Sequence, residues 1–348
     1  MQNRELRTFA VVSAFIAIAI ILVVWGIAYY GLQGFTVRIS KSLINGLALS
    51  MLLFLMVSGF FLIFGLCDVI NFAHGAFFML GGFLGFLVYL QTEAILRDLG
   101  IFGANNYWLS VTAFVASAFV ATVVMALIGG SIEFFTIRRL YGNAVGQILL
   151  TVGFMFIISQ VAEIIFGPPQ CSYFITPYSE LAYFFMGGTI DFGGGLIFEL
   201  VKFYHIGIGL TVAALMFLGF RKTRIGLQIQ AGIEDSEMVQ ALGTDIRKLF
   251  TLVFMLGAGL AGLAGAVLVP EIGANSGHGL TYLIYAFVIV VIGGAHYGRF
   301  EGTFFGALIV GLSTQFASYF LAELESVIIF IIMVIILVIR PGGLTGHE

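Results

Sequence analysis

Charged residues are scarce in this sequence. Asp, Glu, Lys and Arg make up 9% of its 348 residues, whereas soluble domains contain about 25%. Hydrophobic residues make up 60%, and the mean hydropathy is +1.10. A surface of this composition cannot mostly face water, which excludes a soluble globular domain. The 15 Lys and Arg residues are spread thinly along the chain, which argues against a nucleic-acid-binding protein.

Cysteine and proline are rare as well. Two cysteines, Cys67 and Cys171, are too few for a disulfide framework or a metal site. The topology derived below puts them on opposite sides of a membrane, so we expect each to serve as a small apolar side chain. Only 5 prolines accompany 45 glycines. This balance favours closely packed membrane helices, because small residues let helix backbones approach one another.

The sequence motifs of several enzyme classes are missing. A Gly-Lys dipeptide is absent, which excludes a phosphate-binding loop of the GxxxxGK[ST] type, and so are HExxH, CxxC and GxSxG. We therefore expect a chain without catalytic residues that binds no metal or cofactor of its own.

Long apolar stretches, in contrast, are abundant. About 20 apolar residues cross the ~30 Å hydrocarbon core of a bilayer. Candidate stretches cover residues 8–30, 42–66, 75–91, 107–130, 146–166, 199–220, 249–269, 279–294, 302–321 and 325–339. They predict an all-α polytopic membrane protein with about ten transmembrane helices, some of them short or broken. The stretches 75–91 and 279–294 are short enough to be re-entrant.

The basic residues predict the orientation of these helices, because Lys and Arg are enriched in cytoplasmic loops. With the N-terminus in the cytoplasm, only four of the basic residues fall outside: Arg38, Lys41, Arg97 and Lys202. A shift by one span would reverse this bias. We therefore expect both termini to be cytoplasmic.

Two hydrophilic stretches separate the apolar ones. Residues 221–248 form the longest polar segment, on the predicted cytoplasmic side. Its apolar positions, at three- to five-residue spacing, are Ile225, Ile229, Ile233, Met238, Leu242 and Ile246. This spacing predicts two short amphipathic helices broken near Gly232. The segment is either a solvated loop or a docking surface for a soluble partner. The stretch 167–198 contains three prolines and is expected to be an irregular external loop.

Polar residues within apolar stretches mark candidate functional positions, because they are expensive in a membrane. Asp68, Asn71 and His74 interrupt the apolar run GLCDVINFAHGAFF. Transporters use such breaks to face a substrate or a gate, although a packed turn with mutually satisfied polar groups is an equal alternative. The candidates for the substrate pathway or gate are Asn45, Asn71, His74, Glu163 and Gln315. An isolated polar group such as Asn45 or Gln315 is more often a hydrogen bond between helices than a ligand contact. Glu163 stands out because an ionised carboxylate needs a partner or water.

Four segments in a fixed order carry a family resemblance. They are LINGLALSMLLFLMVSGFFLIFGLCDVINFAHGAFFMLGGF, TRIGLQIQAGIEDSEMVQALGTDIRKLFTLVFMLGAGLAGLAGAV, VIGGAHYGRFEGTFFGALIVG and the terminal RPGGL. With them, residues 41–345 resemble the permease of the branched-chain amino acid type of bacterial ABC importer. The most specific element is the run from Val69 to Gly75. Residues 1–40 are longer than usual for this family and are expected to form an N-terminal transmembrane anchor and linker.

The resemblance implies a division of labour in the bacterial inner membrane. Two permease subunits, usually related chains, form the pathway, an external solute-binding protein delivers the solute, and two cytoplasmic ATPases bind ATP and Mg²⁺. Residues 221–248 would be the coupling segment that contacts an ATPase. The positions that match the family there are Gly226, Glu234, Asp235, Glu237 and Gly243.

Several functions fit these observations. The leading hypothesis is ATP-driven import of branched-chain or related small amphipathic amino acids. Within the same family, urea, short amides or aromatic acids are alternative solutes. The GGAHYGRF segment carries bulkier residues than is common in the family, which cautions against copying the substrate. An ion-coupled secondary carrier would need acids within the membrane, and only Glu163 lies plainly within a span. A passive channel is disfavoured by the long cytoplasmic segment. Which solute is carried, and whether the second permease is a copy of this chain, are left open by the sequence.

Overall fold

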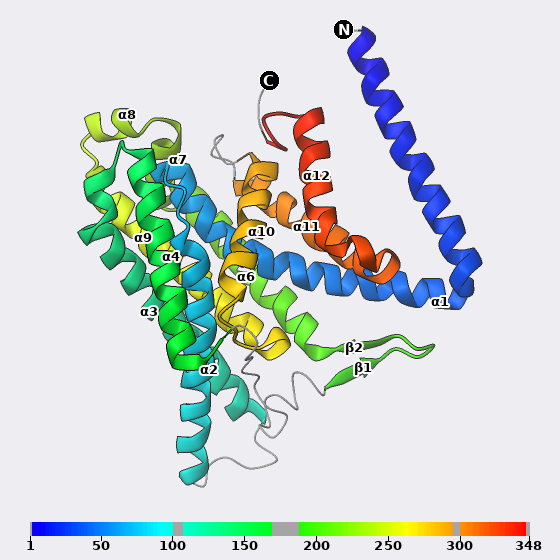
Figure 1. Ribbon diagram of the computed structural model, residues 1–348, viewed down its shortest axis with the longest axis horizontal. Coiled ribbons are helices and arrows are strands. Elements are labelled where there is room, and N and C mark those ends of the chain that lie inside the picture. Colours follow the sequence, from blue (N-terminus) through cyan, green and yellow to red (C-terminus); the bar gives the residue numbers. More distant parts are fainter. Residues whose placement is uncertain (1, 100–106, 169–187, 295–299, 346–348) are drawn as a thin grey trace.

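The computed structural model is almost entirely helical (Figure 1). It describes residues 2–99, 107–168, 188–294 and 300–345, apart from the side chains of residues 2–27, 97 and 107–111. The first elements are α1 (Gln2–Cys67), α2 (Ala73–Asp98), α3 (Tyr107–Phe135), the 3-10 helix η1 (Ile137–Leu140) and α4 (Ala144–Phe166). After the strands β1 (Thr189–Asp191) and β2 (Ile197–Glu199) come α6 (Leu200–Lys222), α7 (Arg224–Glu234) and α8 (Ser236–Ala241). The remaining elements are α9 (Ile246–Ile272), α10 (His278–Gly293), α11 (Phe300–Phe320), the 3-10 helix η4 (Ala322–Leu324) and α12 (Glu325–Ile339).

Eight helices in the described part of the chain are long and apolar enough to cross a membrane. The prediction of an all-α polytopic membrane protein is therefore confirmed. The eight differ from the predicted stretches in two places. α10 is apolar but has only 16 residues, about 24 Å at 1.5 Å per residue. The stretch 8–30 lies in the first part of α1, most of whose side chains are outside the described residues.

Two features of the first half of the chain go beyond what its sequence indicated. The stretch 75–91, short enough to be re-entrant, belongs to the 26-residue helix α2, whose apolar part, Ala73–Leu96, has 24 residues. That length crosses about 36 Å. Between the first two predicted spans, the only interruption of helix is a kink at Gly31, where φ is 71°.

The external stretch 167–198 is more regular than expected in its last third. β1 and β2 pair antiparallel, with Ile190 opposite Phe198, and a run of three glycines with positive φ, starting at Gly193, forms the turn. Cys171, expected to serve as a small apolar side chain, lies outside the described residues.

The helices divide into an inner and an outer set. The most apolar windows of α1, α2 and α9 are 83%, 72% and 72% buried within the chain, whereas those of α4 and α6 are 17% and that of α12 is 6% buried. α2 and α9 approach so closely that a side chain at Gly81 would overlap the backbone of Gly262. Small residues permit such crossings. The outer helices are left to face lipid or a partner subunit.

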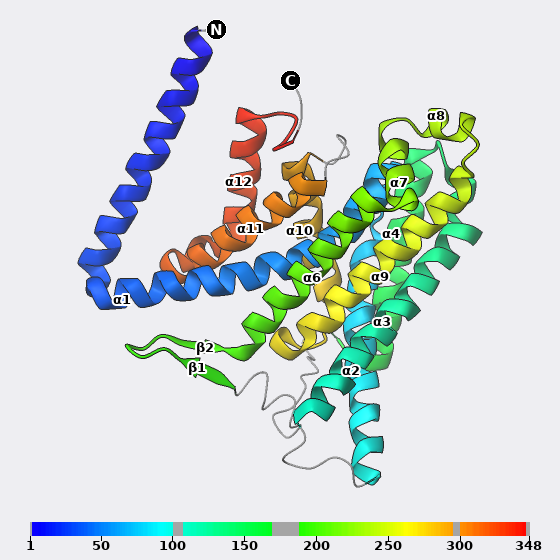
Figure 2. The same ribbon diagram turned by 180° about the vertical axis from the view of Figure 1, so that it is seen from behind.

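The start of α1, the end of α12 and the α7–α8 segment lie at the same end of the molecule, and the β1–β2 hairpin lies away from it (Figures 1 and 2). We call these the inner and the outer end. The assignment of the inner end to the cytoplasm rests on the basic residues and stays a prediction.

Candidate functional site: a break between two helices beside the coupling segment

The polar run between α1 and α2 forms a helix break at residues 68–72. The Asp68 backbone N–H closes the last turn of α1 on the Phe64 carbonyl at 3.1 Å, and Asp68 itself has a φ of 51°. Asp and Asn enter this left-handed region more easily than other non-glycine residues. The side chain of Asn71 accepts a hydrogen bond from the Ala73 N–H at 3.1 Å. Asn71 thus supplies the cap that starts α2.

His74 attaches the first turn of α2 to the interior of α1. Its Nε2 lies 2.9 Å from the Met56 carbonyl oxygen. Because a carbonyl can only accept, Nε2 carries the ring proton. The ring meets Phe60 edge-on at 5.5 Å and lies close to Gly59, where a side chain would overlap the Gly257 carbonyl of α9. His74 therefore lies where α1, α2 and α9 meet.

Two polar atoms of the break have no hydrogen-bond partner among the described residues. They are Asn71 Nδ2 and His74 Nδ1, and both side chains are fully buried. An unsatisfied buried polar group costs about 1–3 kcal/mol. The packed-turn alternative therefore describes the break only in part, since its polar groups do not fully satisfy one another.

The other candidate pathway residues lie elsewhere. Asn45 donates from Nδ2 to the hydroxyl of Tyr319 at 2.8 Å, between α1 and α11. Gln315 is half-buried one turn before Tyr319. Glu163 is half-buried near the end of α4 and accepts a hydrogen bond from Gln160 at 3.3 Å. The structure thus puts Asn71 and His74 in one helix break, and it places Asn45 of α1 against Tyr319, one turn from Gln315 on α11. It does not join the five into one site.

The coupling segment forms two helices, as predicted, but the break between them is at Asp235 and not near Gly232. Gly232 is instead buried against Leu66 in the last turn of α1, so closely that a side chain at this position would overlap Leu66. Asp235 stops α7 and caps α8 by accepting from the Met238 N–H at 2.9 Å. α7 thereby touches α1 immediately before the helix break.

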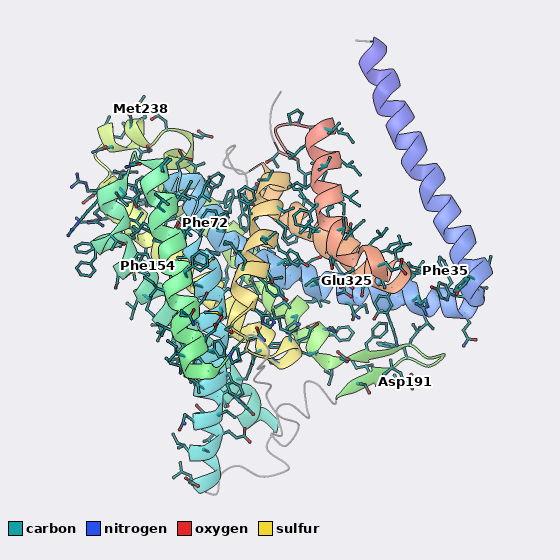
Figure 3. All side chains as sticks on the ribbon, in the orientation of Figure 1. Phe35, Phe72, Phe154, Asp191, Met238 and Glu325 are labelled. Carbon is teal, nitrogen blue, oxygen red and sulfur yellow. The ribbon has the colours of Figure 1, made fainter. Side chains whose placement is uncertain are left out.

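The surface of this segment is acidic with exposed apolar side chains. Glu234, Asp235 and Glu237 are exposed, and so are Met238 (57%) and Leu242 (79%); Met238 lies on α8 at the inner end (Figure 3). Exposed apolar residues in a polar surround are typical of a protein contact. Of the five predicted coupling residues, Gly226 is buried against α6, and Gly243 forms the turn after α8 with a φ of 91°.

After that turn, Asp245 caps α9 by accepting from the Lys248 N–H at 3.3 Å, and its carboxylate pairs with the Lys248 ammonium at 3.1 Å. These hydrogen bonds from Lys248 lower the pKa of Asp245. The start of α9 is therefore fixed directly behind the coupling segment.

A buried ionic cluster at the inner end was not anticipated as a functional element. Glu133 of α3 is fully buried, and its carboxylate contacts Arg138 at 3.2 Å. It also accepts hydrogen bonds from the hydroxyls of Thr251 at 2.6 Å and Tyr141 at 3.1 Å. Burial first, and then the neighbouring Cys67 and Glu133, raise the pKa of Tyr141 above its usual range, so the phenol stays a donor. The only signal in the sequence is an acid five residues before an arginine at the end of an apolar stretch.

This Glu133 cluster joins the start of α9 to its neighbours. Arg138 also donates to Thr251 and, at 3.3 Å, to the Arg247 carbonyl in the first turn of α9. A further link comes from α4, where the Thr151 hydroxyl lies 3.3 Å from the Ile70 carbonyl inside the helix break. The coupling segment, the Glu133 cluster and the helix break thus form one continuous set of contacts.

A second ionic cluster lies at the outer end of α9. Glu271 contacts the Lys202 ammonium at 2.5 Å and His205 Nδ1 at 3.0 Å. His205 Nε2 lies 3.1 Å from the Val267 carbonyl, so both ring nitrogens face oxygen acceptors. These contacts hold α6 against α9. No signal in the sequence pairs these residues.

Comparisons with known proteins place the chain in a family. Residues 42–337 match the family model described as branched-chain amino acid transport system / permease component. The chain is 27% identical over 315 residues to the high-affinity branched-chain amino acid transport system permease protein BraD of Pseudomonas aeruginosa. That alignment covers 88% of this chain and 95% of BraD.

Two further relatives agree with this match. The chain is 25% identical to the high-affinity branched-chain amino acid transport system permease protein LivH of Escherichia coli K12, over 88% of this chain and 95% of LivH. It is 26% identical to the probable branched-chain amino acid transport permease protein LivH of Methanocaldococcus jannaschii, over 86% of this chain and 90% of that protein. No solved structure matches the chain.

Replacing Arg138 tests whether the Glu133 cluster stabilises the inner end. Arg138→Gln leaves the buried Glu133 carboxylate facing only two hydroxyls. We therefore expect the free energy of unfolding to fall by about 3 kcal/mol, which is typical of breaking a buried ion pair. The loss is measured as a lower midpoint of thermal unfolding in detergent. Arg139→Gln is the matched control, because Arg139 is exposed and makes no ion pair within the described residues; its effect should stay within about 0.5 kcal/mol. Equal midpoints for the two variants would show that the cluster is dispensable.

Proposed function

Since the chain belongs to the branched-chain amino acid transport system permease family, we propose that it is the membrane-spanning permease subunit of an ATP-driven importer in the bacterial inner membrane. The proposed solutes are branched-chain or related small amphipathic amino acids, as the names of the relatives imply. The observation that carries the proposal is the family match over residues 42–337. ATP and Mg²⁺ bind to partner ATPases, and this chain supplies the pathway.

The partners occupy different surfaces. One of two cytoplasmic ATPases docks on the α7–α8 segment through Glu234, Asp235, Glu237 and the exposed Met238 and Leu242. An external solute-binding protein delivers the amino acid at the outer end. The weakly buried helices α4, α6 and α12 leave faces for lipid and for a second, related permease subunit.

The contacts around the helix break favour a mechanism for coupling. When ATP binding draws the ATPases together, the α7–α8 segment moves with them, as in rigid-body switching of packed elements. α7 lies against Leu66, and only four residues lie between the end of α8 and the start of α9. The movement therefore reaches the break at residues 68–72 directly and through the Glu133 cluster.

The break is the proposed inner gate. Its two unsatisfied polar atoms and the positive φ of Asp68 make this conformation costly. A second conformation of the break, in which these groups gain partners, is then close in free energy. A small movement of the α7–α8 segment can convert one conformation into the other. Asn45, Gln315 and Glu163 are assigned to the outer part of the pathway.

Reconstitution tests the proposed function. The chain in liposomes, together with its cognate permease, ATPases and binding protein, should accumulate leucine or valine only when ATP is supplied. Uptake by this chain alone, driven by a proton or sodium gradient, would instead identify a secondary carrier.

Charge reversal tests the ATPase contact. We expect the double variant Glu234→Lys, Asp235→Lys to lose ATPase co-purification and at least 90% of ATP-driven uptake. The reason is that two positive charges would replace two negative charges on the surface proposed to contact the ATPase. Asp191→Lys is the control, since Asp191 is an exposed acid on the hairpin, away from α8 (Figure 3). Intact ATPase binding in the double variant would place the contact elsewhere.

Replacement of His74 tests the gate. His74→Leu removes the hydrogen bond to Met56 and should lower uptake about tenfold or more while the ATPases still co-purify, because tenfold corresponds to the ~1.4 kcal/mol of one such bond. His74→Gln keeps a donor and should retain more uptake than His74→Leu. If both variants transport normally, His74 serves packing only.

A further inference from the structure

An apolar groove is lined by residues of α6, α7 and α9, together with Leu62 of α1. Figure 2 shows the ribbons of α6, α7 and α9 side by side on one face of the molecule. It encloses about 300 Å³, and its walls include Leu62, Leu215, Leu256 and Leu260, with Gly226 and Ile229 at its inner end. Its one polar side chain, Thr223, is already engaged, because its hydroxyl donates to the Gly219 carbonyl and accepts from the Gly226 N–H. The groove therefore offers nothing to a polar ligand.

The length of the groove matches one leaflet of a bilayer. Its lining extends from Val212 of α6 to Thr223, which follows the last residue of that helix; this is about 16 Å at 1.5 Å per residue. Half of the ~30 Å hydrocarbon core is about 15 Å. Leu215 is 62% and Leu256 is 44% exposed, so the groove is open to the side, and α6 is one of the least buried helices of the bundle.

A basic rim flanks the inner end of the groove. It consists of Arg221, Lys222 and Arg224, which do not line the groove themselves but are next to its lining residue Thr223 in the sequence, where α6 ends and α7 begins. Arg221 is committed to Glu301 at 3.2 Å and stacks on Phe217. Lys222 and Arg224 are exposed and make no ion pair within the described chain. Two free cations thus stand where the polar headgroups of the inner leaflet begin.

We propose that this groove binds one acyl chain of an anionic phospholipid, whose phosphate pairs with Lys222 and Arg224. Charge complementarity favours an anionic phospholipid over a neutral lipid, because basic residues at the cytoplasmic ends of membrane helices attract anionic headgroups. A helix of a second permease subunit would bring an apolar face but no anion for the two cations. The lipid would touch the first turns of α7, so it would also position the segment proposed to dock the ATPase.

Brominated lipids test this inference on the assembled transporter in detergent. A tryptophan is introduced by Leu215→Trp, and phosphatidylglycerol or phosphatidylcholine with brominated acyl chains is added. Because the chain already contains Trp25 and Trp108, the signal is the difference in fluorescence from the same assembly without the substitution. We expect phosphatidylglycerol to quench at a lipid concentration at least fivefold lower than phosphatidylcholine. Phe156→Trp on α4 is the matched control, because Phe156 is 64% exposed but lines no part of the groove. There the two lipids should quench alike.

Removing the charges identifies the headgroup site. In the Leu215→Trp background, each of Lys222→Gln and Arg224→Gln should weaken the phosphatidylglycerol preference about fivefold, whereas Arg139→Gln should leave it unchanged. Equal quenching by both lipids, or a preference that survives both replacements, would overturn the proposal. Absence of quenching by either lipid would overturn it too, and would show that a protein subunit covers the groove. The measurement needs neither ATP nor solute, so it stands apart from the proposed transport function.

Discussion

In the interior of a bilayer no water is present to satisfy a backbone that leaves its helix, so every interruption must be satisfied by the protein itself. The break between α1 and α2 meets this constraint with a small number of contacts. Asn71 caps α2, Asp68 closes α1, and His74 reaches across to the Met56 carbonyl. The glycines of α1 and α9 let the three helices close around the imidazole. The rest of the inner end is arranged around this junction.

α9 connects that junction to both ends of the molecule. Near its start, Thr251 joins the buried Glu133 cluster, and near its end, Glu271 binds Lys202 and His205. Between these ionic contacts, α9 packs on α2 and α3 through glycine and alanine. Buried charges are expensive unless they are paired, so the two clusters define where α9 sits along its axis.

The coupling segment adds an exposed element to this buried frame. α7 is held by glycine contacts with α6 and α1, whereas α8 presents acids and apolar side chains outward. The same α6–α7 turn borders the apolar groove with its basic rim. A soluble partner and the proposed lipid would therefore contact the molecule within a few residues of each other. Both would act on the last turn of α1, next to the break.

Much of this could be predicted from the sequence, because it depends on composition and local spacing. The length of the apolar stretches identified the membrane helices, and the polar run from Asp68 to His74 indicated the break. The spacing of apolar residues within 221–248 predicted two amphipathic helices. Local signals also failed in places. The actual end of α7 at Asp235 depends on a capping hydrogen bond, and α2 (Ala73–Asp98) extends past both ends of the predicted stretch 75–91. The candidate pathway residues stay a prediction, and the sequence did not indicate that Asn45 bonds to Tyr319 of α11 while His74, in the helix break, contacts the Met56 carbonyl.

Only the tertiary structure decided which polar groups meet. Thr251 and Glu133 are separated by 118 positions in the chain, and Lys202 and Glu271 by 69. Helical periodicity can place a side chain on a face, but it does not say which helix that face meets. In a membrane the apolar pattern is even less informative, because lipid and protein interior are equally apolar. The sequence thus determined that the chain crosses the membrane and where its helices are interrupted, while close packing at glycine and the pairing of buried charges determined how those interruptions are joined.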